Sequence, residues 1–225
     1  MSIWIIMILV MVLSWIIQQT LNRRFDKYSR VGTPGGMTGA DVARKMLADN
    51  GITDVEVTCI PGRLTDHFDP TRKVINLSES VYAQTNMAAA AVAAHETGHA
   101  IQHATGYAPL RLRSALVPVV SFANNTVQWV LLAGVVLIQF TDKLLWLGII
   151  LFAMTTFFSL VTLPVEIDAS SRAVKWLGNS GVTDVETAPM AKDALKWAAY
   201  TYVIAAIGSL ATLLYYISIA SGNRR

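Results

Sequence analysis

Four long apolar segments dominate the pattern of hydrophobic and polar positions along this chain. They cover residues 3–21, 116–140, 144–165 and 200–219 and contain no Asp, Glu, Lys or Arg. About 20 apolar residues suffice to cross the hydrocarbon core of a bilayer as a helix, so each segment predicts a transmembrane helix. The first segment has no basic residues before it and no small-residue cleavage site, which indicates a retained anchor rather than a signal peptide.

The basic residues are distributed unevenly between the two sides that these helices define. Residues 23–115 hold eleven Lys and Arg, and residues 166–199 hold four. The other side keeps three, which are Lys143, Arg224 and Arg225. Because loops rich in Lys and Arg stay in the cytoplasm, we expect both larger segments to be cytoplasmic and both chain ends to lie outside.

Between the first two apolar segments the pattern changes to short amphipathic elements. Thr38 is a typical N-cap for a helix over residues 40–49, and residues 55–60 alternate like a strand. Two further strands, 64–68 and 73–77, are joined through a Pro-containing turn and predict a β-hairpin. A second helix is expected over residues 86–104, with Gly106 as its stop.

The expected fold is therefore a mostly α-helical membrane protein with about four transmembrane helices and a small α+β domain. Its parts are a transmembrane anchor (1–22), a cytoplasmic domain (34–115), two transmembrane helices (116–165), a cytoplasmic helical segment (166–199) and a last transmembrane helix (200–219). A domain of residues 34–115 is too short for a large core of its own. We therefore expect it to pack on residues 166–199 and on the membrane spans.

Composition narrows the possible functions further. The chain is 53% hydrophobic, which is too apolar for an ordinary soluble domain. A net charge of +3, with the basic residues beside the apolar segments, does not indicate a nucleic-acid-binding protein. The single cysteine, Cys59, excludes an internal disulfide, and we expect it to be a buried side chain on a strand.

The strongest chemical signal is the string His95-Glu96-Thr97-Gly98-His99. In a chain with four His and five Glu, an H-E-x-x-H string arises by chance about 0.0015 times. Residues four apart lie on one face of a helix, so His95 and His99 can bind one metal ion, with Glu96 beside it as a base for a bound water. Gly98 weakens a helix, and we expect it to allow a neighbour to approach closely.

A zinc site with an open position for water needs a third protein ligand. His103 lies about 12 Å farther along the helix axis than His95 and cannot reach the same ion. We expect His103 to donate a hydrogen bond either to a metal ligand, from the side away from the metal, or to the substrate. The best candidate is Glu166, which directly follows an apolar segment, with Asp168 as a supporting residue or an alternative ligand. Glu79 and Glu186 remain further alternatives.

Three stretches of the chain resemble the YugP-like family of bacterial neutral zinc metallopeptidases. They are Leu64-Thr65-Asp66-His67-Phe68-Asp69-Pro70, the string from Ala93 to His103 around the histidine motif, and Glu166-Ile167-Asp168-Ala169-Ser170. The resemblance covers most of the chain. It implies a membrane-bound, zinc-dependent peptidase of gluzincin-like, and so zincin-like, architecture. A more distant similarity extends to membrane gluzincins of the HtpX and Ste24 kind.

The resemblance also suggests roles for residues outside the motif. In gluzincins a strand edge beside the metal binds the substrate as an added strand, which would here be the strand containing Asp66 and Phe68. His67 would then be near enough to donate to a developing oxyanion, although a contact with Asp66 or Asp69 that stabilises the hairpin is the competing interpretation. The distant relatives carry an Asp four residues after the ligand Glu, where this chain has Ser170.

These observations predict an integral-membrane zinc endopeptidase of the bacterial plasma membrane. One Zn²⁺ per chain, held by His95, His99 and Glu166, would face the cytoplasm, and Glu96 would act as general base. Its partners would be peptide or membrane-protein substrates and the lipid bilayer.

Two alternatives stay open. An intramembrane protease is disfavoured because the motif helix is only about 18 residues long and has polar flanks. A non-catalytic zinc scaffold would need a fourth protein ligand, for which the sequence has no evident candidate.

Overall fold

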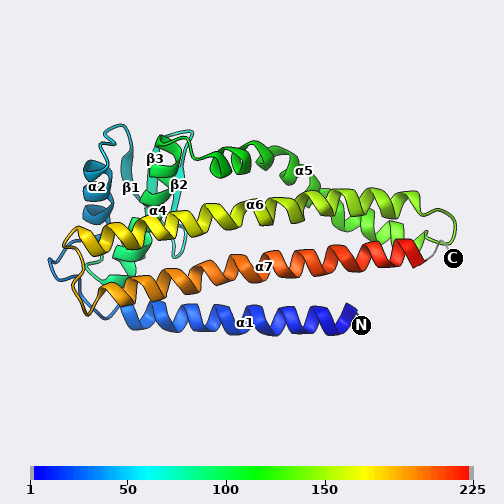
Figure 1. Cartoon of the computed structure of the whole chain (residues 1–225), viewed down its shortest axis with the longest axis horizontal. Helices are drawn as coiled ribbons and strands as arrows, with labels where there is room; N and C mark the ends of the chain where they lie inside the picture. The colour runs from blue at the N-terminus through cyan, green and yellow to red at the C-terminus, as the bar shows by residue number, and fades with distance from the viewer. Residues whose placement is uncertain (1–2, 223–225) are drawn as a thin grey trace. The chain divides into compact units, whose positions relative to one another are not determined.

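The computed structural model describes residues 3–222 and is mostly helical. Figure 1 labels ten elements in chain order: α1 (Ile3–Tyr28), α2 (Gly39–Asp49), β1 (Glu56–Ile60), β2 (His67–Asp69), β3 (Val74–Ser78), α3 (Glu79–Tyr82), α4 (Met87–Ala104), α5 (Ala108–Val136), α6 (Lys143–Asn179) and α7 (Ala188–Gly222). Among the described residues, α1, α5, α6 and α7 are long and apolar enough to cross a membrane. The expectation of four such helices is therefore confirmed.

The described chain divides into two compact units. One contains residues 3–16, 111–164 and 201–222, and we call it the helical unit. The other contains residues 17–110 and 165–200 and includes the sheet, and we call it the mixed unit. The long helices α1, α6 and α7 each contribute a segment to both units.

Small residues bring the helices of the helical unit close together. A Cβ on Gly148 of α6 would lie 2.7 Å from Cδ2 of Leu131 on α5, so only glycine fits there without a shift. Thr156 of α6 and Ser209 of α7 share a hydrogen bond of 2.7 Å between their hydroxyl groups. Both features are typical of helices that associate in lipid, where close backbone approach and polar contacts replace the hydrophobic effect.

The mixed unit has one core, to which helices and sheet both contribute. The apolar face of α2, with Val42 and Met46, is fully buried, as its helical periodicity predicts. It packs with Ile75 of β3 and with the alanines of α4. Ala173 and Leu177 of α6 and Ala191 and Leu195 of α7 belong to the same core.

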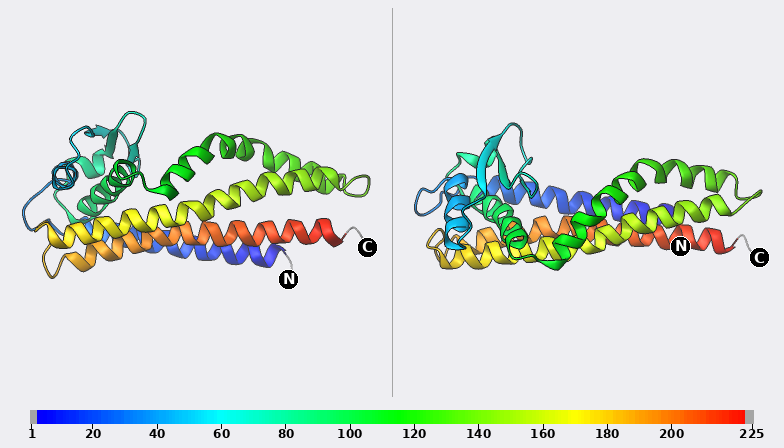
Figure 2. Two further views of the ribbon diagram at one scale, coloured as in Figure 1. Left: turned by 45° about the horizontal axis from the view of Figure 1, so that its top comes forward. Right: turned by 90° about the horizontal axis from the view of Figure 1, so that it is seen from above.

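The three strands form one small mixed sheet in the order β1-β3-β2. β1 runs parallel to β3, and β2 runs antiparallel to β3 with His67 opposite Asn76. The sheet lies beside α2 and α4 in both views of Figure 2, and α4 contacts β2 and β3. β2 therefore forms one edge of the sheet, on the side of the motif helix.

Two local expectations need correction. β2 is limited to His67–Asp69 instead of residues 64–68, because Leu64 has a φ of +60°, a left-handed conformation that interrupts an extended strand. Cys59 does lie on β1, but it is exposed rather than buried. β1 is the other edge strand of the sheet, and Cys59 lies near its end.

Candidate metal centre

The motif helix α4 begins and ends where its sequence predicts. The Asn86 side chain accepts a hydrogen bond of 3.0 Å from the backbone N–H of Ala89, which is an N-cap. At the other end Gly106 adopts a φ of +64°, and the N–H of Tyr107 donates to the carbonyl of Gln102. Both contacts satisfy backbone groups that a helix end leaves without partners, so the helix is fixed at both ends.

Helix α6 brings the third candidate ligand to this helix. α6 continues without a break through Pro164, so Glu166 lies inside a helix and does not cap a new one. A Cβ on Gly98 would lie only 2.7 Å from the carbonyl oxygen of Ala169, which is one turn beyond Glu166. The glycine in the motif therefore lets α4 and α6 touch backbone to backbone, and this confirms the expectation of a close approach.

His95, His99 and Glu166 form a compact cluster of three possible metal ligands. Oε2 of Glu166 lies 3.3 Å from Nε2 of His95 and 3.6 Å from Nε2 of His99. Donor atoms around a tetrahedral zinc ion are roughly 3.3 Å apart at ordinary bond lengths. The spacing and the donor types, two imidazoles and one carboxylate, therefore fit a zinc site that keeps its fourth position for water.

The cluster is shielded from solvent and electrically negative. The side chains of His95, His99 and Glu166 are 13%, 10% and 3% exposed. Burial alone would lower the pKa of His99, but the nearby negative charges of Glu166 and Glu96 outweigh burial and raise that pKa. The position is therefore one where a positive charge is stabilised, as metal binding requires.

Each histidine is oriented by a partner behind it. Nδ1 of His95 lies 3.1 Å from Oγ of Ser170, and Nδ1 of His99 lies 3.0 Å from Oε1 of Gln102. Because Oε1 of Gln102 can only accept, the His99 proton is on Nδ1 and Nε2 is left for a metal. Such partners hold the ring and the tautomer of a metal-binding histidine.

Gln102 is itself fixed by α6. It is completely buried, and its Nε2 donates to the carbonyl of Val165 at 2.7 Å and to Oδ2 of Asp168 at 2.8 Å. Arg172 donates to the same Asp168 oxygen at 2.6 Å. Asp168 therefore contacts Gln102 and is not part of the cluster of His95, His99 and Glu166. Sequence reasoning missed Gln102, although its position three residues after His99 places it on the same helix face.

The remaining candidate residues lie on or near β2. Nδ1 of His67 is 2.8 Å from the carbonyl of Thr65 and Nε2 is 3.1 Å from Nδ2 of Asn76, so His67 donates to the first and accepts from the second. In this arrangement it has no proton left for a substrate, and its role as an oxyanion donor stays a prediction. The His103 ring lies 5.7 Å from the Phe68 ring.

Asp66 fixes the start of β2. Its carboxylate accepts hydrogen bonds from the backbone N–H and the hydroxyl of Ser78, at 2.7 and 3.0 Å. Asp69 accepts from the backbone N–H groups of Thr71 and Arg72 in the turn. The competing interpretation expected the His67 ring to contact Asp66 or Asp69. The hydrogen bonds of this ring are instead with Thr65 and Asn76.

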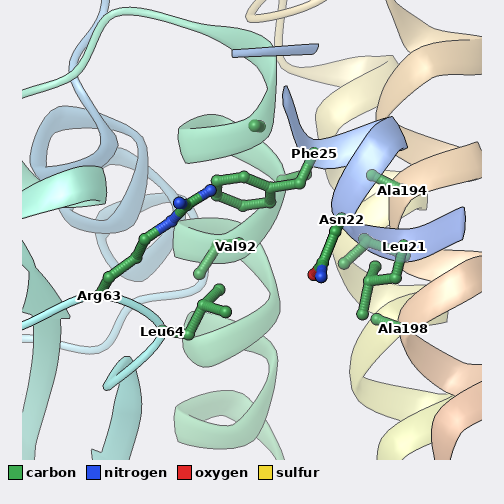
Figure 3. Close-up of a pocket in the computed structure, with 11 residues that line it drawn as sticks. Leu21, Asn22, Phe25, Arg63, Leu64, Val92, Ala194 and Ala198 are labelled. Atoms are coloured by element: carbon green, nitrogen blue, oxygen red, sulfur yellow. The ribbon is translucent and has the colours of Figure 1, made fainter. Parts of the chain in front are cut away.

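An apolar pocket lies on the same face of α4, one turn before the metal ligands. Its volume is about 110 Å³, and α1, the loop before β2, α4 and α7 contribute to its walls. Val92 precedes His95 by three residues, and its side chain lies beside that of Leu64 (Figure 3). The lining residues are Leu21, Asn22, Phe25, Arg63, Leu64, Ala88, Ala91, Val92, Ala194, Leu195 and Ala198.

The structure combines four helices long and apolar enough to cross a membrane, among the described residues, with a two-histidine, one-carboxylate cluster that fits a zinc ion, and the comparisons with known proteins agree with both features. The chain belongs to the family described as "putative neutral zinc metallopeptidase", which it matches over residues 3–221. It is also 43% identical over 212 residues to "Putative membrane protease YugP" of Bacillus subtilis (strain 168), covering 94% of this chain and 93% of that protein. No solved structure matches the chain.

The family membership confirms two expectations from the sequence. The resemblance to this family is correct, and Zn²⁺ is the cofactor that the family uses. The His95, His99 and Glu166 cluster provides a group of side chains that fits this ion.

Proposed function

We propose that this chain is a zinc endopeptidase of the bacterial plasma membrane that hydrolyses peptide bonds at the cytoplasmic membrane face. The observation that carries the proposal is the convergence of His95 and His99 of α4 with Glu166 of α6 at spacings suited to one zinc ion. Glu96 is next to the first of these ligands. Membership of a metallopeptidase family supports hydrolysis as the reaction.

The proposed mechanism divides the work among four side chains. His95, His99 and Glu166 would hold the ion, which when bound lowers the pKa of water to near 7 and polarises a carbonyl. Glu96 would take a proton from the attacking water and pass it to the amide nitrogen as the peptide bond breaks. Ser170 and Gln102 would keep both imidazoles directed at the metal.

The sheet edge and the apolar pocket offer a place for the substrate. β2 pairs with β3 on one side only, so its outer edge can accept an extended peptide as an added strand. The peptide would pair with the backbone of β2 beside Phe68. The hydrogen bonds of Asp66 with Ser78 hold the start of this strand in place. The pocket under Leu64 and Val92 would take one apolar side chain of that peptide.

Two features favour this proposal over its alternatives. In the mixed unit the ligands lie beside a three-stranded sheet, which suits a peptide at the membrane face better than one inside the bilayer. A structural zinc site would be closed by a fourth protein ligand, whereas the cluster found among the described residues has three members.

The cytoplasmic orientation can be tested with the native protein, because Cys59 is the single cysteine and is exposed. A membrane-impermeant maleimide should leave Cys59 unlabelled in intact cells and label it after permeabilisation. The matched control is the double variant Cys59→Ser/Thr141→Cys, whose cysteine should be labelled in intact cells. Labelling of native Cys59 from outside would invert the proposed topology.

Substrates can be found by comparing membrane proteomes of cells that carry the native protein or Glu96→Gln. Full-length proteins and fragments whose ratio changes should share cleavage sites near a cytoplasmic membrane boundary. Identical proteomes, together with no cleavage of added peptides by the purified native protein, would reject the proposed function.

A further inference from the structure

A second cleft in the mixed unit lies between α6 and α7 and is strongly basic. Its volume is about 460 Å³. Three lysines line it, Lys175 from α6 and Lys192 and Lys196 from α7. Lys192 and Lys196 are four residues apart and therefore on one face of their helix. Three positive charges thus converge on a single concave surface.

Among the described residues that line the cleft, none provides a counter-charge for these lysines, although Nζ of Lys196 lies 5.6 Å from the centre of the Tyr200 ring. None of its lining residues is acidic. The nearby carboxylates are used elsewhere: Glu166 contacts the two histidines, Asp168 pairs with Arg172, and Asp193 pairs with Arg24. Because unbalanced lysines produce a local positive potential, the cleft should attract an anion.

The rest of the lining is amphipathic. The hydroxyl groups of Ser170 and Ser171 provide hydrogen-bond donors for anionic oxygens, whereas Ile167, Val174 and Leu195 provide apolar surface. Ile167 is 53% exposed, which is high for a large apolar side chain in a cleft. A ligand that carries both a phosphate and hydrocarbon would match this lining better than inorganic phosphate.

The position along the helices favours a lipid. The apolar segment of α6 ends near Val165 and that of α7 begins near Tyr200. Lys196 and Lys192 precede Tyr200 by about 6 and 12 Å along the helix, and Lys175 follows Val165 by about 15 Å. Bilayer headgroups occupy roughly the first 5–8 Å outside the hydrocarbon, and long lysine side chains extend toward them.

We propose that this cleft binds the phosphate headgroup of an anionic phospholipid from the leaflet that the mixed unit faces. The bound lipid would also support the metal centre, because Ser170 lines the cleft and its Oγ lies 3.1 Å from Nδ1 of His95. Only this second effect rests on the proposed peptidase function. Binding itself is independent of catalysis.

The test uses the full-length Glu96→Gln protein in nanodiscs of phosphatidylcholine, with or without phosphatidylglycerol, and native mass spectrometry of the lipid that stays bound. We expect preferential retention of phosphatidylglycerol. At about fivefold per lysine, Lys192→Gln/Lys196→Gln should weaken it roughly 30-fold. The control Lys45→Gln/Lys73→Gln removes the same charge from lysines that pair with Asp49 and Asp54, and it should retain the lipid.

Three results would overturn the site. Equal retention by the lysine variant and the control, or no preference for phosphatidylglycerol, would exclude lipid recognition by these lysines. Complete displacement of the lipid by inorganic phosphate or glycerol 3-phosphate would show a site for free phosphate instead.

The effect of the lipid on the metal centre is measured in catalytically competent protein. Phosphatidylglycerol should raise peptide cleavage, and Lys192→Gln/Lys196→Gln should lose that increase. Lipid retention without any cleavage would keep the lipid site and reject the peptidase.

Discussion

Gly98 and Ala169 approach so closely that a single added methyl group would not fit between them. A Cβ on Gly98 would lie 2.7 Å from the carbonyl oxygen of Ala169 and 3.1 Å from its Cα. Both neighbours are backbone atoms, so no side chain can move aside to make room. This contact sets the distance between the helix that carries two histidines and the helix that carries Glu166.

Gly98→Ala should therefore separate the metal ligands although it touches none of them. We expect zinc affinity to fall at least tenfold and the free energy of unfolding to drop by about 1–3 kcal/mol, as in overpacked cores. Zinc titration and thermal unfolding measure the two effects. Gly178→Ala is the control, because a Cβ there meets nothing within 4 Å and alanine favours a helix. Normal zinc affinity in Gly98→Ala would contradict this role of the contact.

The third ligand can be assigned by comparing Glu166→Ala with Asp168→Ala. Removal of the Glu166 carboxylate leaves two histidines, so zinc occupancy should collapse at neutral pH. Asp168→Ala should keep the zinc and reduce activity about 10–100-fold, because Asp168 acts on His99 only through Gln102. Metal analysis of both purified variants decides between them. If Asp168→Ala loses the zinc and Glu166→Ala keeps it, Asp168 is the third ligand and Glu166 is not.

The hydrogen bond behind His95 gives a prediction with opposite outcomes for two substitutions at one position. Ser170→Ala removes the partner of Nδ1 and should weaken zinc binding about tenfold. Ser170→Asp keeps an acceptor there and should bind zinc at least as tightly as the native protein. Ser159→Ala is the control, because the Ser159 hydroxyl donates to the carbonyl of Thr155 in the same helix. Equal zinc affinities for all of these proteins would show that the bond does not orient the ligand.

The sequence predicted those parts of the site that local rules determine. Helix α4 and its stop at Gly106 follow from propensity and capping, whereas the role of Asn86 as its N-cap came from the structure. The spacing of His95 and His99 follows from the helical period. Glu166 could be selected because the chain has few glutamates. A carboxylate directly after an apolar segment is also costly and is usually functional.

The parts that depend on packing between distant segments were not accessible in this way. The hydrogen bonds of Gln102 to α6 and the contact of Ser170 with His95 could be seen only once α4 and α6 were placed side by side. The parallel pairing of β1 with β3 is likewise a contact between separate segments. The exposure of Cys59 depends on what covers an edge strand, which no local pattern reports.

The apolar pocket can be tested at Leu64, which lines it with a left-handed backbone conformation. Leu64→Gly removes this wall without straining the backbone, because glycine readily adopts a positive φ. Cleavage of peptides with one large aliphatic residue should fall about 10-fold in kcat/KM, with less change for peptides that have alanine there. Lys73→Gly relieves the same kind of backbone strain at a φ of +53° outside the pocket and is the control. An equal loss for both peptides would contradict a side-chain pocket.

The central claim is that the zinc centre of this chain hydrolyses peptide bonds with Glu96 as its base. The most direct measurement is zinc content and peptide cleavage of the purified full-length protein and its Glu96→Gln variant, in the same membrane mimic. We expect both proteins to hold one zinc ion per chain and the variant to lose at least about 100-fold in turnover, since the amide cannot accept a proton. A variant that keeps its zinc and cleaves peptides at the native rate would contradict the account.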